Sequence, residues 1–441
     1  MPVPFRSFIL LVIVLSWCLS LGSPPAKADT WEGLSNSGLR AADEGRYEEA
    51  ESIFRRAHQL GAVFDQSDPR HATSINNLAY ALHVNGRYDE AVELYLQAIA
   101  IREATLGREH PDVAESCNNL GELYRALGRY EESERLHRRA LNIRKETFGD
   151  DHPESAQSMN NLGVLYAHRR LFERAGTLYQ QALEIREKSY GDDHPATAET
   201  RNNLATLHYA RGRFIEAKAL FLRALETEQE ELDSHHPSLA TTLSNLAELY
   251  RAQGKLDEAL EHHQHAVEIR REGLGDEHPA TAQSLNNLAV TQFERGNAMQ
   301  AEKLYRQALR IQKGALGDEH PDLALTLNNL AELLRVQRRF DEAKPLYRRA
   351  LAIEEAAFGS NHPDLALGLN NLALLHFDQG AYVEAESLLD RALAIEEGHF
   401  GQNNPGLIVT LENYAIVLRE LRRHREAEQM EARAETLRAR L

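Results

Sequence analysis

One asparagine recurs every 42 residues along this chain, and its carboxamide is chemically suited to holding a peptide backbone. The amide nitrogen donates hydrogen bonds and the amide oxygen accepts them, so the group can bind an extended peptide whatever side chains that peptide carries. The series, which we call the asparagine ladder, consists of Asn77, Asn119, Asn161, Asn203, Asn245, Asn287, Asn329, Asn371 and Asn413.

Histidine recurs with the same period and can bind metal ions or transfer protons near neutral pH. Seven copies directly precede a proline: His110, His152, His194, His236, His278, His320 and His362. Neighbouring copies would stand a full repeat apart, whereas a metal ion needs its ligands about 2 Å away. We therefore predict that these histidines mark the start of helices and bind no metal, and we interpret His262, His263 and His265 as structural too.

Known catalytic motifs are missing from the sequence. It contains no phosphate-binding glycine loop, no His-Glu-x-x-His pair, no nucleophile-elbow serine and no cysteine-rich metal spacing. We therefore predict that the protein is not an enzyme, with no catalytic residue, no metal site and no cofactor.

Apolar residues within one period follow the rhythm of an α-helix. The first stripe has members at i, i+3, i+4 and i+7, namely Ile75, Leu78, Ala79 and Leu82. A Gly-Arg-Tyr break at 86–88 separates this helix from a second one of about four turns. Each period therefore predicts two successive helices.

Glycine and proline punctuate these helices. The second helix runs towards Gly107, which we expect to cap it in the left-handed conformation that glycine adopts readily. Pro111 then restarts the pattern, because proline suits the first turn of a helix and disfavours helical geometry in the residue before it. Ten antiparallel helix pairs fit between Trp31 and Leu441.

Small residues recur where the two helices of a pair would touch. Alanine holds one place of the second helix in all ten copies: Ala57, Ala98, Ala140, Ala182, Ala224, Ala266, Ala308, Ala350, Ala392 and Ala434. Small side chains let helix axes approach to the lower end of the usual range of roughly 8 to 10 Å. With an aromatic residue such as Tyr88, Tyr130 or Phe340 after the turn, this pattern resembles the tetratricopeptide repeat.

The resemblance implies an all-α fold, a right-handed superhelical solenoid of about ten helix-turn-helix repeats. It covers residues 31–441. The expected repeats are approximately 31–67, 68–109, 110–151, 152–193, 194–235, 236–277, 278–319, 320–361, 362–403 and 404–441, within one solenoid over 29–441.

The repeat length and the run Leu-Asn-Asn-Leu-Ala-Glu-Leu at 327–333 resemble the long repeats of kinesin light chains and their bacterial relatives. In kinesin light chains the matching asparagines contact the backbone of cargo peptides, and the resemblance implies the same for the asparagine ladder. A structural interpretation is also open, in which each asparagine bonds the adjacent helix and fixes the register between repeats. The two roles are not exclusive.

A helical wheel places the ladder opposite the apolar stripe, on the side that lines the concave groove of tetratricopeptide arrays. Eight carboxylates and no lysine or arginine share that side: Glu115, Glu122, Glu199, Glu248, Glu294, Glu332, Asp378 and Glu420. Arginine follows three of them by three residues, a spacing at which opposite charges pair, at Arg125, Arg251 and Arg335. Kinesin light chains select acidic cargo, so the sequence departs from them and predicts a preference for neutral or basic peptides.

The first 28 residues have the pattern of a signal peptide. An apolar run from Phe8 to Leu21 precedes Ala26-Lys27-Ala28, the small-residue pattern of a cleavage site before Asp29. The run of 14 residues is short for a membrane span, which needs roughly 20. We expect export to a periplasmic or secreted location without a membrane span. An uncleaved anchor and a lipid on Cys18 are the alternatives.

Charge argues against nucleic acid as a partner. The formal net charge is -17 and no basic stripe occurs, whereas nucleic-acid binding relies on clustered lysine and arginine. We expect solvated arginines that complement helix dipoles near the ends of second helices, at Arg102, Arg144, Arg186 and Arg270. Cys117 falls on the apolar stripe and is interpreted as a small core residue. Arg201 falls on the same stripe, and the sequence suggests no partner for it.

Together these features predict a non-enzymatic scaffold or adaptor that binds a protein or an extended peptide in its concave groove. The alternative is a structural solenoid that assembles end to end with copies of itself. Solenoids need polar end caps to stay monomeric. The last pair carries His424 and Glu431 at places that are aromatic in other copies, which favours a monomeric array.

Overall fold

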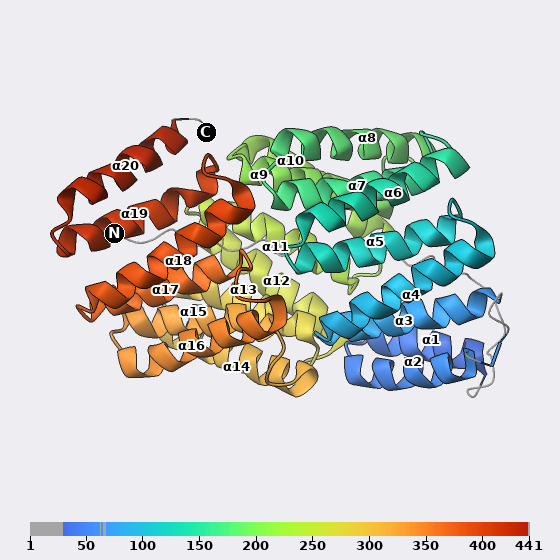
Figure 1. The fold of residues 1–441 in the computed structure, drawn as a ribbon, viewed down its shortest axis with the longest axis horizontal. Coiled ribbons are helices and arrows are strands. Elements are labelled where there is room, and N and C mark those ends of the chain that lie inside the picture. The colour runs from blue at the N-terminus through green and yellow to red at the C-terminus, as the bar shows by residue number, and fades with distance from the viewer. Residues whose placement is uncertain (1–29, 62, 65–67, 440–441) are drawn as a thin grey trace. The chain divides into compact units, whose positions relative to one another are not determined.

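The computed structural model describes residues 30–61, 63–64 and 68–439, and these residues fold into ten consecutive antiparallel pairs of α-helices (Figure 1). The first helices of the pairs are α1 (Trp31–Asp43), α3 (Pro69–Val84), α5 (Pro111–Ala126), α7 (Pro153–His168), α9 (Pro195–Ala210), α11 (Pro237–Ala252), α13 (Pro279–Glu294), α15 (Asp322–Val336), α17 (Leu365–Asp378) and α19 (Ile408–Glu420). The predicted all-α repeat fold is confirmed.

The second helices are α2 (Tyr47–Gly61), α4 (Tyr88–Leu106), α6 (Tyr130–Phe148), α8 (Phe172–Tyr190), α10 (Phe214–Glu231), α12 (Leu256–Leu274), α14 (Ala298–Leu316), α16 (Phe340–Phe358), α18 (Tyr382–Phe400) and α20 (His424–Arg438). A short 3₁₀ turn at Pro405–Leu407 precedes α19. The predicted signal peptide, including Cys18, lies outside the described residues.

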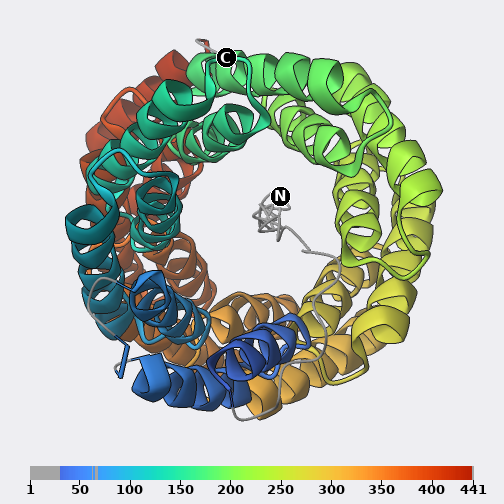
Figure 2. The same cartoon turned by 90° about the vertical axis from the view of Figure 1, so that its right-hand side faces the viewer.

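The chain divides into two compact units, residues 1–297 and 298–441. Within each unit the two helices of a pair pack along their length, and each pair packs against the next. First helices also contact the first helices of neighbouring repeats, as α5 contacts α7 and α15 contacts α17. First helices therefore form the inner layer of each unit. In Figure 2 the helices of the N-terminal unit, coloured blue to yellow, lie in two layers.

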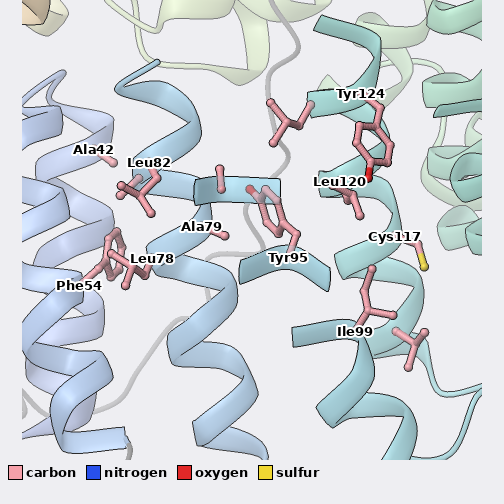
Figure 3. Close-up of a cluster of buried hydrophobic side chains, with 14 of the residues drawn as sticks. Ala42, Phe54, Leu78, Ala79, Leu82, Tyr95, Ile99, Cys117, Leu120 and Tyr124 are labelled. Carbon is pink, nitrogen blue, oxygen red and sulfur yellow. The ribbon is translucent and has the colours of Figure 1, made fainter. Parts of the chain in front are cut away.

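The recurrent alanines lie where the two helices of a pair meet, and all ten are buried as predicted. Larger side chains fill the space between repeats. In the first unit, Tyr95 from α4 lies between Ala79 of α3 and Leu120 of α5 (Figure 3). Cys117 is buried in the same cluster, where burial raises the pKa of its thiol to about 11. It is thus a core residue, as predicted.

The first and seventh repeats of the N-terminal unit meet where α1 ends. A Cβ atom built on Gly45 would lie 2.6 Å from Nε2 of His278, and His278 itself is buried. The corresponding turn glycines Gly212 and Gly254 have open space around the same position. The seventh repeat of this unit therefore contacts the first repeat, which lies six repeats earlier in the chain.

The expected left-handed cap at the end of α4 is only half right. Gly107 has φ 94° and ψ 156°, so φ is positive but the backbone is extended rather than left-handed helical. Its amide still donates to the carbonyl of Glu103. The extended ψ carries the chain across to α5, a geometry that residues with a Cβ atom avoid.

Each recurrent histidine caps the start of a first helix. Nδ1 of His110 accepts a hydrogen bond from the amide of Asp112 at 3.2 Å, and His278 does the same for Ala280 at 3.0 Å. Asp68 and Asn404 make this bond in two other repeats. The predicted role at the start of helices is confirmed. The acceptor function requires an unprotonated Nδ1.

Acid should weaken the cap at His278. Burial lowers the pKa of His278 from 6.5 to about 4, so its contribution is complete above pH 6.5 and is lost as pH falls towards 4. Urea unfolding should show the parent losing up to about 3 kcal/mol more than His278→Asn across this range, because asparagine caps without titrating. Parallel pH profiles of the two proteins would contradict this expectation.

Candidate binding face on the first helices

The asparagine ladder lies on the inner layer and is split between buried and partly exposed positions. Asn77, Asn161 and Asn413 are buried, and the other members are partly exposed. The side chains therefore sit at the boundary between the joint of two repeats and the inner surface.

Some ladder members bond the preceding repeat. The Nδ2 of Asn203 donates to Oδ1 of Asn160 at 3.0 Å. Two equivalent bonds, each of 3.1 Å, join Asn245 to Asn202 and Asn413 to Asn370. These bonds support the register role for the members that make them.

The acceptors belong to a second column of asparagines that sequence reasoning missed. Each lies one residue before a ladder member: Asn76, Asn118, Asn160, Asn202, Asn286, Asn328 and Asn370. They also bond the following repeat, since Ser116 donates to Asn76 at 3.0 Å and Asn370 donates to Thr410 at 2.8 Å. The repeated Asn-Asn dipeptide was the sequence signal for this second column. Adjacent residues on a helix point about 100° apart, so the two asparagines reach different partners.

Some other ladder members have carboxamide donors or acceptors that are not used by the described residues. Asn119 and Asn371 are partly exposed, and their side chains make no hydrogen bond to any residue that the structure describes. Asn77 makes none either but is buried. Asn161 accepts a bond from Gln157 at 3.2 Å. The ladder thus contains both register-fixing members and members open to a ligand.

The predicted pairs between glutamate and arginine three residues apart are formed. The distances are 2.9 Å for Arg125 and Glu122, and 2.7 Å both for Arg251 with Glu248 and for Arg335 with Glu332. The expectation that these carboxylates line an open groove is wrong for Glu122 and Glu248, which are buried.

A polar ring on the second helix explains this burial. The Nε2 of His137 lies 3.2 Å from Glu122, that of His263 lies 3.3 Å from Glu248, and the hydroxyl of Tyr347 donates to Glu332 at 2.8 Å. Three repeats thus contain a cluster of glutamate, arginine and a polar ring, which we call the ion clusters. In the sequence, the signal is a glutamate and an arginine in the first helix together with a histidine or tyrosine in the second helix. A helical wheel of one helix cannot show such a combination.

Two of the ion clusters keep their carboxylates, Glu122 and Glu248, charged. Burial alone would raise the pKa of Glu122, but Arg125 and His137 outweigh it and lower the pKa to about 2. His263 and Arg251 likewise lower the pKa of Glu248 to about 2 against the effect of burial. Both groups are therefore ionised across the physiological pH range and act as fixed internal charges.

Most of the other predicted groove carboxylates also have a cation partner, contrary to expectation. Glu115 pairs with Arg102 at 3.1 Å and Glu199 pairs with Arg186 at 3.2 Å. Glu294 and Asp378 bind the arginines of the ion clusters in the preceding repeat. Glu420 alone of the eight makes no ion pair with a described residue. The cations come from neighbouring helices, so considering one helix at a time missed them.

The arginines near the ends of second helices are buried, so the expectation of solvated cations is wrong. Arg102 donates to the hydroxyl of Ser116 at 2.8 Å, and Arg270 donates to Ser284 at 3.0 Å and to the carbonyl of Ala280 at 2.9 Å. Arg144 and Arg186 bind the next first helix in the same way. We call this series the arginine column. It joins each of these second helices to the following repeat.

Arg201 is also buried, and the loop before α9 supplies its partners. It pairs with Glu187 at 2.9 Å and donates to the backbone carbonyl of Asp192 at 2.6 Å. The side chain of Asp192 binds it as well. These bonds offset the cost of burying the guanidinium group of Arg201 on the apolar stripe.

Removing one member of an ion cluster should be costly. Glu248→Val leaves Arg251 and His263 buried without their carboxylate, and we expect it to lower stability by about 3–5 kcal/mol. The next repeat carries an alternative set at these three places: Val290, Phe293 and Tyr305. Copying that set with Glu248→Val, Arg251→Phe and His263→Tyr should restore most of the loss in urea unfolding. A single variant as stable as the parent would rule out the cluster.

Comparison with known families agrees with this architecture. A model described as the tetratricopeptide repeat matches the chain in eight overlapping segments that run from residues 70–146 to 364–440. The chain belongs to the tetratricopeptide repeat family. No curated protein is significantly similar to it. No helix among the described residues is both long and apolar enough to cross a membrane, and those residues contain no cluster of potential metal ligands.

Several solved tetratricopeptide-like structures are similar to parts of the chain. A Podospora anserina protein described as a kinesin light chain with nearly identical repeats is 28% identical, with a TM-score of 0.39, over 46% of this chain and 97% of that one. BtubC (BKLC) from P. vanneervenii is 26% identical over 55% and 92% of the two chains, with a TM-score of 0.40. The apo form of RapI is 16% identical over 64% and 97%, with a TM-score of 0.48.

Proposed function

We propose that this protein is a non-enzymatic adaptor that binds an extended segment of a partner protein along the inner layer of first helices. Tetratricopeptide repeats typically serve protein–protein interaction, which gives the general class. The observation that carries the proposal is the unused carboxamide of Asn119 and of Asn371, each partly exposed on this layer. Such a group can donate to and accept from a peptide backbone at once.

A preference for neutral or basic partners remains part of the proposal on weaker grounds than the sequence offered. Ion pairing neutralises most of the inner carboxylates, and Glu420 has no ion-pair partner among the described residues. The net charge of -17 still disfavours acidic partners at long range. We also propose that the adaptor acts as a monomer.

Export is the second part of the proposal. The signal-peptide pattern of residues 1–28 supports cleavage before Asp29 and a periplasmic or secreted location. Mass spectrometry of the native protein should give a mature chain that starts at Asp29. A native chain that retains Met1, or that carries a lipid on Cys18, would contradict export as a soluble protein.

The two kinds of ladder member allow a matched test of partner binding. Asn119→Ala with Asn371→Ala removes open carboxamides, whereas Asn203→Ala with Asn245→Ala removes register bonds at equivalent places. The first pair should weaken binding to a peptide array about tenfold with an unchanged thermal midpoint, because each unit loses one ligand hydrogen bond. The second pair should lower stability by about 1 kcal/mol per bond.

The pattern of results is decisive. Normal peptide binding by the Asn119 and Asn371 variant would refute the ladder as a ligand site. An unchanged thermal midpoint for the Asn203 and Asn245 variant would refute its register role.

A further inference from the structure

The inner layer changes chemical character in the C-terminal unit. Four residues before each ladder asparagine, the first helices of the N-terminal unit carry only polar side chains: Thr73, Glu115, Gln157, Glu199, Thr241 and Gln283. The three first helices of the C-terminal unit carry Leu325, Leu367 and Val409 at this place, each partly exposed. The difference holds for all nine repeats that carry a ladder asparagine.

Two further positions on the same side carry apolar residues in some of these helices. Three and seven residues after the ladder asparagine a helix returns to nearly the same direction. Leu374 and Ile416 occupy the first position and Val336 the second, and Val336 and Ile416 are 53% and 47% exposed. Leu374, Val409 and Ile416 all lie outside the apolar core around Leu389 and Leu411. We call Leu325, Val336, Leu367, Leu374, Val409 and Ile416 the apolar strip.

Carboxylates border the apolar strip at both ends of its helices. Asp322 and Asp364 lie at the starts of α15 and α17, seven residues before the ladder asparagines, and both are exposed. Asp378 and Glu420 lie at the ends of α17 and α19 and are exposed too. Arg335 pairs with Asp378, but the strip positions and these flanking positions contain no lysine or arginine.

We propose that the apolar strip docks an extended partner segment with bulky apolar side chains, flanked by lysine or arginine. The apolar side chains would cover the strip and the flanking cations would meet the four carboxylates, while the open carboxamide of Asn371 holds the backbone between them. An acidic segment would place like charges together at both borders. This inference rests on the proposed adaptor function and specifies the partner chemistry for one unit.

Defined synthetic peptides provide the probe. The first is a fluorescent peptide of alternating leucine and serine with two lysines at each end. The second replaces the lysines with glutamates, and the third replaces the leucines with serines. Fluorescence anisotropy with the full chain should show binding of the first peptide, at least tenfold weaker binding of the other two, and weakening of the first by salt.

Variants locate the binding site. Leu325→Gln with Leu367→Gln installs the residue found at this place in α7 and α13, and it should weaken the lysine–leucine peptide about tenfold. Ile416→Thr copies Thr206 at an exposed position, so it tests the strip without disturbing the core. Val383→Gln, which alters an exposed apolar residue of the second helix α18, is the control and should bind normally.

Each outcome bears on a separate part of the inference. Normal binding by the Leu325 and Leu367 variant and by Ile416→Thr overturns the apolar strip, and equal binding of the glutamate-flanked peptide overturns the charge preference. Loss in the strip variants with normal binding by the Asn119 and Asn371 variant supports the strip and refutes the ladder. The reverse result leaves the adaptor function standing and removes this inference.

Discussion

The joint between successive repeats is the constraint on which this molecule depends. Each helix pair has an apolar face that only the next pair can cover, so the fold is a sum of joints rather than one core. Apolar contact is non-directional and by itself leaves neighbouring helices free to slide. Buried hydrogen bonds have a direction, and here the second asparagine column and the arginine column supply them at the joints.

This dependence explains which features could be predicted from the sequence. The helix pairs, their order and the buried alanines follow from spacing alone, because a 3.6-residue period and a small residue at a contact act within one repeat. The paired carboxylates did not follow, since Glu294 is neutralised by Arg251 from the preceding repeat. Partners about 43 residues apart come together only once the stacking geometry is known.

The ion clusters show the same limit within a single repeat. Glu122 looked like an exposed carboxylate because the helical wheel of α5 takes no account of α6. His137 reaches it from α6, where most other repeats place a tyrosine, phenylalanine or leucine. The buried positions of the inner layer are therefore those that side chains of the second helix cover, and the exposed positions are those that it leaves uncovered.

The arginine of the arginine column is replaced at four joints by Glu228, Gln312, Glu354 and Glu396. One carboxyl oxygen of Glu228 and one of Glu354 are buried without a described hydrogen-bond partner. Burial raises the pKa of Glu228 to about 7 and that of Glu354 to about 8. A carboxyl group can donate to the next helix, as arginine does, only while it is protonated.

The sign of this pH dependence is opposite to that of the cap at His278. A raised pKa means that the stabilising contribution of Glu228 and Glu354 is complete below about pH 4.5 and is lost as pH rises through about 7 and 8. The cap at His278 weakens instead as pH falls from 6.5 towards 4. Stability near neutral pH is thus limited from both sides by different joints. Because each repeat contacts only its neighbours, a change at one joint loosens the array locally and leaves the joints held by arginine intact.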